Sequence, residues 1–221
     1  MIAAVLSVVL ASTAAVAAPK PSAECVTYDG AYAQAPLMTV LGQTGSKVHL
    51  QDRALPCPQG STCPWVRAGY VLPGDQVFVS APLNGFRCVY MGARGRLTAG
   101  FLPDAALAVT ASNDLITPAW LVGRWSDGNS LIVVSNKGGE LVADGDAIWP
   151  GRNFNGPPGP NIGGFQGSAR ISGSTVTLSD GDCQVEARRR GPYLIVFDNA
   201  NCGGMNVRFM GIYASGSPFK P

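Results

Sequence analysis

The sequence contains a single histidine, His49, and this scarcity limits the catalytic chemistry open to the chain. Ser–His–Asp and Cys–His mechanisms would both have to use this one side chain. It lies in a short apolar stretch that predicts a strand, where a packed or surface histidine is the simpler interpretation. The G-x-S-x-G, H-E-x-x-H, P-loop and Rossmann glycine patterns are also missing. We therefore expect a protein that is not an enzyme and that uses no cofactor and no metal.

Charge is scarce as well. Only 14% of the residues are charged, and the formal net charge is +2. Nucleic-acid binding needs a clustered basic face, so no nucleic-acid partner is expected. Stretches with helical periodicity are almost absent, whereas 28 glycines and 17 prolines supply material for many tight turns. This composition predicts an all-β fold.

Long apolar runs are confined to the first residues of the chain. Residues 1–18 carry no charged side chain, and Ala15-Val16-Ala17 offers an A-x-A cleavage site. We expect residues 1–17 to be a secretory signal peptide, which places the mature protein in the periplasm or outside the cell. The alternative is an uncleaved membrane anchor, but the run is shorter than the roughly 20 residues of a spanning helix. No later stretch approaches that length, so no stable membrane insertion is expected after cleavage.

Six cysteines follow this segment, and in an exported chain an even number predicts disulfides. Two lie in the C-terminal half and four in the N-terminal half, where three pairings are possible. A local pair in the loop C-P-Q-G-S-T-C is favoured, and it leaves one long-range pair. The pairs expected on this basis are Cys183–Cys202, Cys57–Cys63 and Cys25–Cys88. Closing the loop between the first of these pairs contributes roughly 3 kcal/mol in the chain-entropy model.

The length fits two small domains better than one, because domains cluster near about 100–150 residues. We expect a first domain at residues 18–110, a linker at 111–118, a second domain at 119–215 and a disordered tail at 216–221.

The most informative stretch of the first domain is residues 70–107, which predicts a succession of short strands with a hairpin turn at Asn84-Gly85. An opening strand is expected at residues 47–50. In the strand at 76–79, Val77 and Val79 share one face. Together with Gly74-Asp75-Gln76-Val77, this order resembles the bacterial SH3 (SH3b) family over residues 46–109. The resemblance implies a small SH3-like barrel that binds cell-wall peptide or a partner protein.

The second domain shows about eight short strands between residues 120 and 213, which predict a small antiparallel barrel or sandwich. Residues 193–197 are continuously apolar, as in a strand covered on both faces. Gly123-Arg124-Trp125 matches the G-x-W start of lipocalin-like barrels. The segments 120–125, 142–149 and 198–213 also resemble a β domain that accompanies LprI-type lysozyme-inhibitor modules in exported bacterial proteins.

Five residues are candidates for ligand contact. Trp65, Tyr70 and Tyr90 are aromatics with a polar tip that suit a shallow peptide or glycan groove, with core packing as the alternative. Arg189 lies in the one basic run and could meet an anionic partner, although a solvated strand end is the simpler interpretation. Phe154 belongs to residues 153–164, N-F-N-G-P-P-G-P-N-I-G-G, which predict an irregular interaction loop or an ordinary connection.

The tripeptide Asp-Gly-Asp occurs at residues 144–146 and 180–182. Two carboxylates could share acid–base work, but both copies are expected to be turns, because Asp-Gly tolerates positive φ. The sequence therefore favours a non-catalytic envelope protein that binds peptidoglycan or an envelope protein. An inhibitor of a wall-degrading enzyme such as lysozyme is the first alternative, and a wall hydrolase that uses the Asp pairs is the second.

Overall fold

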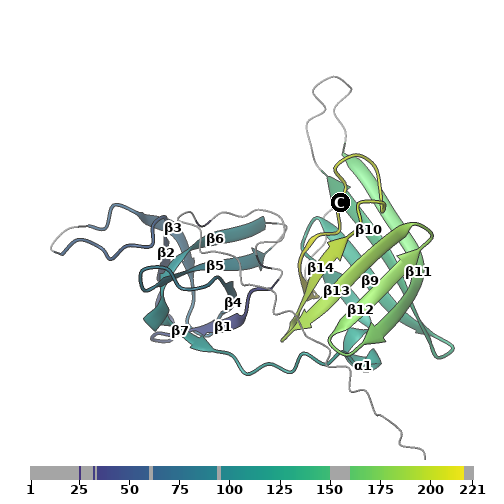
Figure 1. Ribbon diagram of the computed structural model, residues 1–221, viewed down its shortest axis with the longest axis horizontal. Coiled ribbons are helices and arrows are strands. Elements are labelled where there is room, and N and C mark those ends of the chain that lie inside the picture. The colour runs from purple at the N-terminus through teal and green to yellow at the C-terminus, as the bar shows by residue number, and fades with distance from the viewer. Residues whose placement is uncertain are drawn as a thin grey trace, which may run out of the picture.

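A computed structural model describes residues 25, 32, 34–59, 62–93, 96–149 and 160–216. The described chain is all-β, as expected, and forms a seven-stranded antiparallel sheet followed by a closed eight-stranded antiparallel barrel (Figure 1). The expected signal peptide and the expected tail beyond Gly216 lie outside the described residues. Within them, no helix is long and apolar enough to cross a membrane.

The sheet has the strand order β3-β2-β6-β5-β4-β1-β7, so β3 and β7 are its edges. All of its neighbouring strands run antiparallel. A 3₁₀ turn, η1 (Asp104–Ala106), precedes the last strand. The strands are β1 (Leu37–Val40), β2 (Val48–Gln51), β3 (Val66–Val71), β4 (Gln76–Val79), β5 (Phe86–Ala93), β6 (Arg96–Pro103) and β7 (Leu107–Val109).

The sheet begins ten residues earlier than the sequence predicts. The expected opening strand at residues 47–50 is β2, whereas the first strand is β1, at Leu37. β1 lies between β4 and β7, with Met38 opposite both Val77 and Val109. Leu37, Met38 and Val40 are all buried, so this strand is apolar on both faces and lacks the alternation that marks a half-exposed strand.

The sheet buries both of its faces. Val77 and Val79 pack with Val89 in one cluster, as their two-residue spacing predicts. Phe78 and Tyr90, from the same strands, pack in a second cluster on the opposite face. Between β4 and β5, Asn84 and Gly85 have φ values of 51° and 79°, which confirms the expected hairpin turn.

In the barrel each strand pairs with the next one along the chain, and β15 closes the ring on β8 through Ala214 opposite Ser126. Of the two folds expected for the second domain, a barrel or a sandwich, the barrel is confirmed. The strands are β8 (Gly123–Ser126), β9 (Ser130–Lys137), β10 (Glu140–Trp149), β11 (Asn161–Ser172), β12 (Thr175–Asp180), β13 (Cys183–Arg190), β14 (Tyr193–Asp198) and β15 (Gly211–Ser215).

Apolar side chains fill the barrel interior. Trp125, from the G-x-W segment, is 2% exposed and its indole N–H donates to the Leu121 carbonyl at 2.8 Å. Leu121 belongs to the short helix α1 (Pro118–Leu121). Phe165 and Phe209 pack edge to face with ring centres 5.0 Å apart, and the Tyr213 hydroxyl donates to the Phe209 carbonyl at 2.9 Å.

Two local predictions in the barrel are wrong. Asp144-Gly145-Asp146 lies inside strand β10 rather than in a turn. Gly145 is required there because a Cβ would overlap the ring of Phe165 on β11. Residues 161–164, expected to be irregular, belong to β11, where a Cβ on Gly163 would come within 2.6 Å of Gly203. Asp180-Gly181-Asp182 is a turn, as expected, with Gly181 at φ 55°.

The sheet and the barrel pack directly on each other, side by side in Figure 1. β14 supplies much of the barrel's contact. Leu194 and Val196 point into the barrel core, whereas Ile195 packs in the cluster of the sheet. Tyr193 meets Phe78 of the sheet with ring centres 5.7 Å apart. The expectation of a strand covered on both faces is confirmed, and the second cover is the first domain.

Three disulfides join Cys25 to Cys88, Cys57 to Cys63 and Cys183 to Cys202. These are the pairings that the spacing favours, and all six cysteines are used. Disulfides persist in oxidising compartments, so the three pairs suggest an extracytoplasmic environment.

Candidate functional site

The edge strand β3 is the most exposed strand of the first sheet. Five of its six residues, all except Val71, are solvent-exposed. Val66 and Tyr70 are each 41% exposed. An edge strand with apolar side chains and one unpaired backbone edge is a place where another molecule can pair or pack. We call the side chains of Lys47, His49, Arg53, Trp65 and Tyr70 around this strand the β3 surface; all are exposed except Trp65, which is half-buried.

Tyr70 lies near the end of β3, directly opposite His49 on β2. The two rings are tilted, with centres 6.0 Å apart. The ammonium of Lys47 lies 4.4 Å from the centre of the Tyr70 ring, within the range of a cation–π contact. One face of this phenol ring is thus occupied by a cation, and the side chain remains partly open to solvent.

Trp65 immediately precedes β3, and its indole N–H donates to the Leu55 carbonyl at 3.2 Å. This bond fixes the ring against the backbone at Leu55. The Arg53 guanidinium lies 6.0 Å from the indole centre. Trp65 is half-buried, so its ring is held in place and still presents surface.

The charge on this surface is mainly positive. Arg67 forms an ion pair with Asp52 and also donates to the Ala99 carbonyl at 2.7 Å, so its charge is balanced internally. No described ion pair engages Lys47 or Arg53. These two cations, placed beside two aromatic rings, favour ligands that carry carboxylate or phosphate groups together with apolar or ring surface.

The other sequence candidates have different settings. Tyr90 is 6% exposed and packs between sheet and barrel, so its prediction as a groove residue is wrong. Phe154 lies outside the described residues. Arg189 donates to the carbonyls of Gly191 and Leu115, so its guanidinium has an internal role.

The structure therefore places Trp65 just before β3 and Tyr70 near the end of this strand, and shows no contact between the two side chains. Four residues lie between them in the chain, and each has its own cationic neighbour. The sequence analysis overlooked Lys47 and Arg53. Each cation precedes its aromatic neighbour by more than ten positions, and no local sequence pattern predicts a contact over that separation. The β2–β3 pairing of His49 with Tyr70 is what creates the arrangement near Lys47.

No family model, no curated protein and no solved structure matches this chain.

Proposed function

We propose that this chain is an exported, non-catalytic envelope protein that binds peptidoglycan or an envelope protein through the β3 surface of an SH3b-like module. The observation that carries the proposal is the exposure of β3 at a sheet edge, with Tyr70 beside Lys47 and Trp65 beside Arg53. Cell-wall stem peptides carry free carboxylates, and wall glycans offer ring faces. Both features complement cations placed beside aromatic rings.

Two further observations support the proposal. The three disulfides suit an extracytoplasmic address. The succession of short strands expected along residues 70–107 is present as β3 to β7, and β1 adds one strand between β4 and β7. Small β modules of this kind commonly act by binding, with aromatic and arginine side chains at the centre of the contact.

The test is co-sedimentation with purified peptidoglycan sacculi. The wild-type protein should pellet with the sacculi, and Trp65→Ala and Tyr70→Ala should each reduce the pelleted fraction severalfold. Val109→Ala is the matched control, because Val109 is 86% exposed on β7, the opposite edge of the same sheet. This variant should pellet like the wild type.

Added salt distinguishes the electrostatic part of the contact from the aromatic part. Binding that depends on Lys47 and Arg53 should weaken as salt rises, because exposed charges are screened over about 10 Å at 0.1 M. A protein that stays in the supernatant and yet blocks lysozyme at equal molar amounts would replace this proposal with an inhibitor. Release of wall fragments that stops on Asp144→Asn would replace it with a hydrolase.

A further inference from the structure

A crevice of about 780 Å³ opens at one end of the barrel, far along the chain from the β3 surface. One wall is the β8–β9 turn with the end of β10, and it presents Asp127, Asn129 and Trp149. The other wall is the loop at residues 199–210, which includes Met205 and Arg208. The loops that join β8 to β9 and β14 to β15 both lie at this end, because consecutive strands of the barrel alternate in direction.

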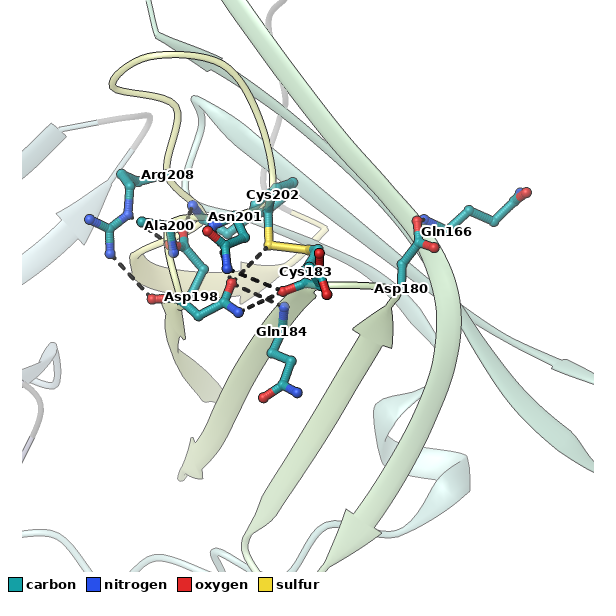
Figure 2. Close-up of a disulfide and its surroundings, with 12 residues drawn as sticks. Gln166, Asp180, Cys183, Gln184, Asp198, Ala200, Asn201, Cys202 and Arg208 are labelled. Atoms are coloured by element: carbon teal, nitrogen blue, oxygen red, sulfur yellow. Dashed lines mark hydrogen bonds and ion pairs between the residues drawn. A yellow bond between two sulfur atoms is a disulfide. The ribbon is translucent and has the colours of Figure 1, made fainter.

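The loop at residues 199–210 is anchored at both of its ends (Figure 2). Near its start, Cys202 is joined to Cys183 of β13. Near its end, the Arg208 guanidinium donates to the Asp198 carboxylate at 2.7 Å and to the Asp198 carbonyl at 3.2 Å. Its middle is held by Asn161, whose side-chain amide donates to the Met205 carbonyl at 2.6 Å. This wall of the crevice is therefore held in a fixed position by covalent and hydrogen-bond contacts.

The opposite wall is equally fixed. The Asp127 carboxylate accepts the backbone N–H groups of Asn129 at 2.9 Å and Ser130 at 2.7 Å through one oxygen, Oδ1. The Ile148 N–H donates to the Asn129 carbonyl at 3.1 Å, which ties the end of β10 to this turn. The second oxygen of Asp127, Oδ2, takes part in neither of these hydrogen bonds.

The charge balance of the lining points to a cationic ligand. Arg208 is neutralised by Asp198, whose side chain is fully buried. Asp127 has no ion-pair partner among the described residues, so once the Arg208–Asp198 pair is counted as neutral, Asp127 is the one unpaired charge among the residues that line the crevice. Burial raises the pKa of Asp127 above its ordinary value of 3.8, although the N–H groups of Ser130 and Asn129 lower it. Such a partly desolvated carboxylate gains from an incoming cation.

The lining also contains four large apolar side chains among its polar groups. Met205 is 79% exposed, and Ile148, Trp149 and Met210 are half-buried. An exposed methionine that lines the same crevice as an aromatic ring suits aliphatic groups, since the thioether adapts its shape to the group that it contacts. An indole ring also attracts an ammonium or guanidinium group that approaches its face.

We propose that this crevice binds an ammonium or guanidinium group carried on an aliphatic chain, with Asp127 as the countercharge and Trp149 and Met205 as the apolar contacts. Lysine and arginine side chains of a polypeptide present this chemistry, and so do free alkylamines. The site is independent of the β3 surface and does not rest on the function proposed above.

The experiment uses hexylamine, its neutral equivalent hexanol, and the peptide Leu-Lys-Leu blocked at both ends, in intact and Nε-acetylated forms. The readout is the indole N–H resonance of Trp149, assigned with Trp149→Phe. Hexylamine and the intact peptide should shift this resonance saturably, whereas hexanol and the acetylated peptide should bind at least tenfold more weakly. Tighter binding of the peptide than of hexylamine would identify a polypeptide as the source, and equal binding a free amine.

The decisive variant is Asp127→Asn, which keeps the oxygen that accepts the two N–H groups and removes the charge. It should lower the affinity for hexylamine to that of hexanol. Asp146→Asn is the matched control, because Asp146 is exposed on β10 and does not line the crevice. Equal binding of hexylamine and hexanol, an Asp127→Asn variant that binds like the wild type, or no binding of any amine would overturn the proposal. Binding of a chitin oligosaccharide that is indifferent to Asp127→Asn would instead assign the crevice to carbohydrate.

Discussion

The Arg189 guanidinium lies 4.1 Å from the centre of the Trp120 ring, and it joins the barrel wall to the segment that enters the barrel. It also donates to the Leu115 carbonyl at 2.6 Å and to the Gly191 carbonyl at 3.0 Å. Beside it, the Asp114 carboxylate accepts the Gly191 N–H at 2.9 Å. The expected linker at residues 111–118 is therefore fastened to β13 and the turn that follows it.

These contacts predict that Arg189→Ala reduces stability. One cation–π contact and two charged hydrogen bonds are lost together, so the free energy of unfolding should fall by about 1–3 kcal/mol. Urea denaturation measures this change. Arg188→Ala is the control, because Arg188 forms only an exposed ion pair with Glu186, and it should cost about 0.5 kcal/mol or less. Unchanged stability of Arg189→Ala with reduced binding to sacculi would make Arg189 a ligand contact instead.

Asp127→Asn should stabilise the protein near neutral pH. Burial raises the pKa of Asp127, so the folded state favours the protonated form. The stabilisation of the folded state by protonated Asp127 is fully present below the ordinary pKa of 3.8. It is lost as pH rises through the raised pKa of the folded state. The charged groups nearby are Arg208 and Asp198, which form an ion pair. The neighbouring Tyr213 hydroxyl is titratable, and burial raises its pKa well above its ordinary value.

Thermal denaturation of both proteins between about pH 3 and about pH 7 measures this effect. The melting temperature of Asp127→Asn should exceed that of the wild type at the upper end, and the difference should shrink toward the lower end. A difference that stays constant with pH, or that reverses its sign, would show that the carboxylate is not penalised by its site. A residue that reduces stability and lines a crevice is typical of a functional position.

Much of the fold was predictable because its signals are local. The hairpin at Asn84-Gly85 needs only two residues with positive φ, and Cys183, Val185 and Ala187 show their buried face by simple alternation. Cys57 and Cys63, only six positions apart, form a disulfide with each other. The apolar run at residues 193–197 correctly predicted a strand that is buried on both faces, but it could not predict that the sheet of the first domain packs on the second face.

The failures come from contacts between distant segments. Asp144-Gly145-Asp146 has turn composition, but its glycine is needed for the ring of Phe165, which comes from the next strand. Tyr90 is a residue type that suits a groove, but it is buried in the cluster that the sheet shares with the barrel. The crevice was overlooked for the same reason, since Asp127 and Met205, which both line it, are 78 positions apart in the chain (205 minus 127).

Gly145→Ala tests the first of these contacts. An added Cβ would overlap the Phe165 ring, which is itself packed against Phe209 and has little room to move. Overpacking of a filled core costs about 1–3 kcal/mol, so the free energy of unfolding should fall by that amount. Gly69→Ala on β3 is the control, because its nearest neighbour would be Leu50 at an ordinary 3.7 Å. Similar losses in both variants would contradict the assignment of Gly145 to close packing.

Strand β14 packs against the barrel core on one face and against the sheet on the other, and two adjacent residues test these two contacts separately. Leu194 and Ile195 are each 1% exposed, but Leu194 belongs to the barrel core and Ile195 to the cluster shared with the sheet. Replacement by alanine should destabilise the protein in both cases, by about 2–5 kcal/mol. Scanning calorimetry should show one transition for the wild type and for Leu194→Ala, because the shared cluster keeps the two units coupled. Ile195→Asp should split the transition in two, since a charge in this cluster separates sheet from barrel while each retains its own core. A single transition in Ile195→Asp, with both units melting together, would mean that the linker at residues 111–118 and its contacts with β13 couple the domains without the apolar contact.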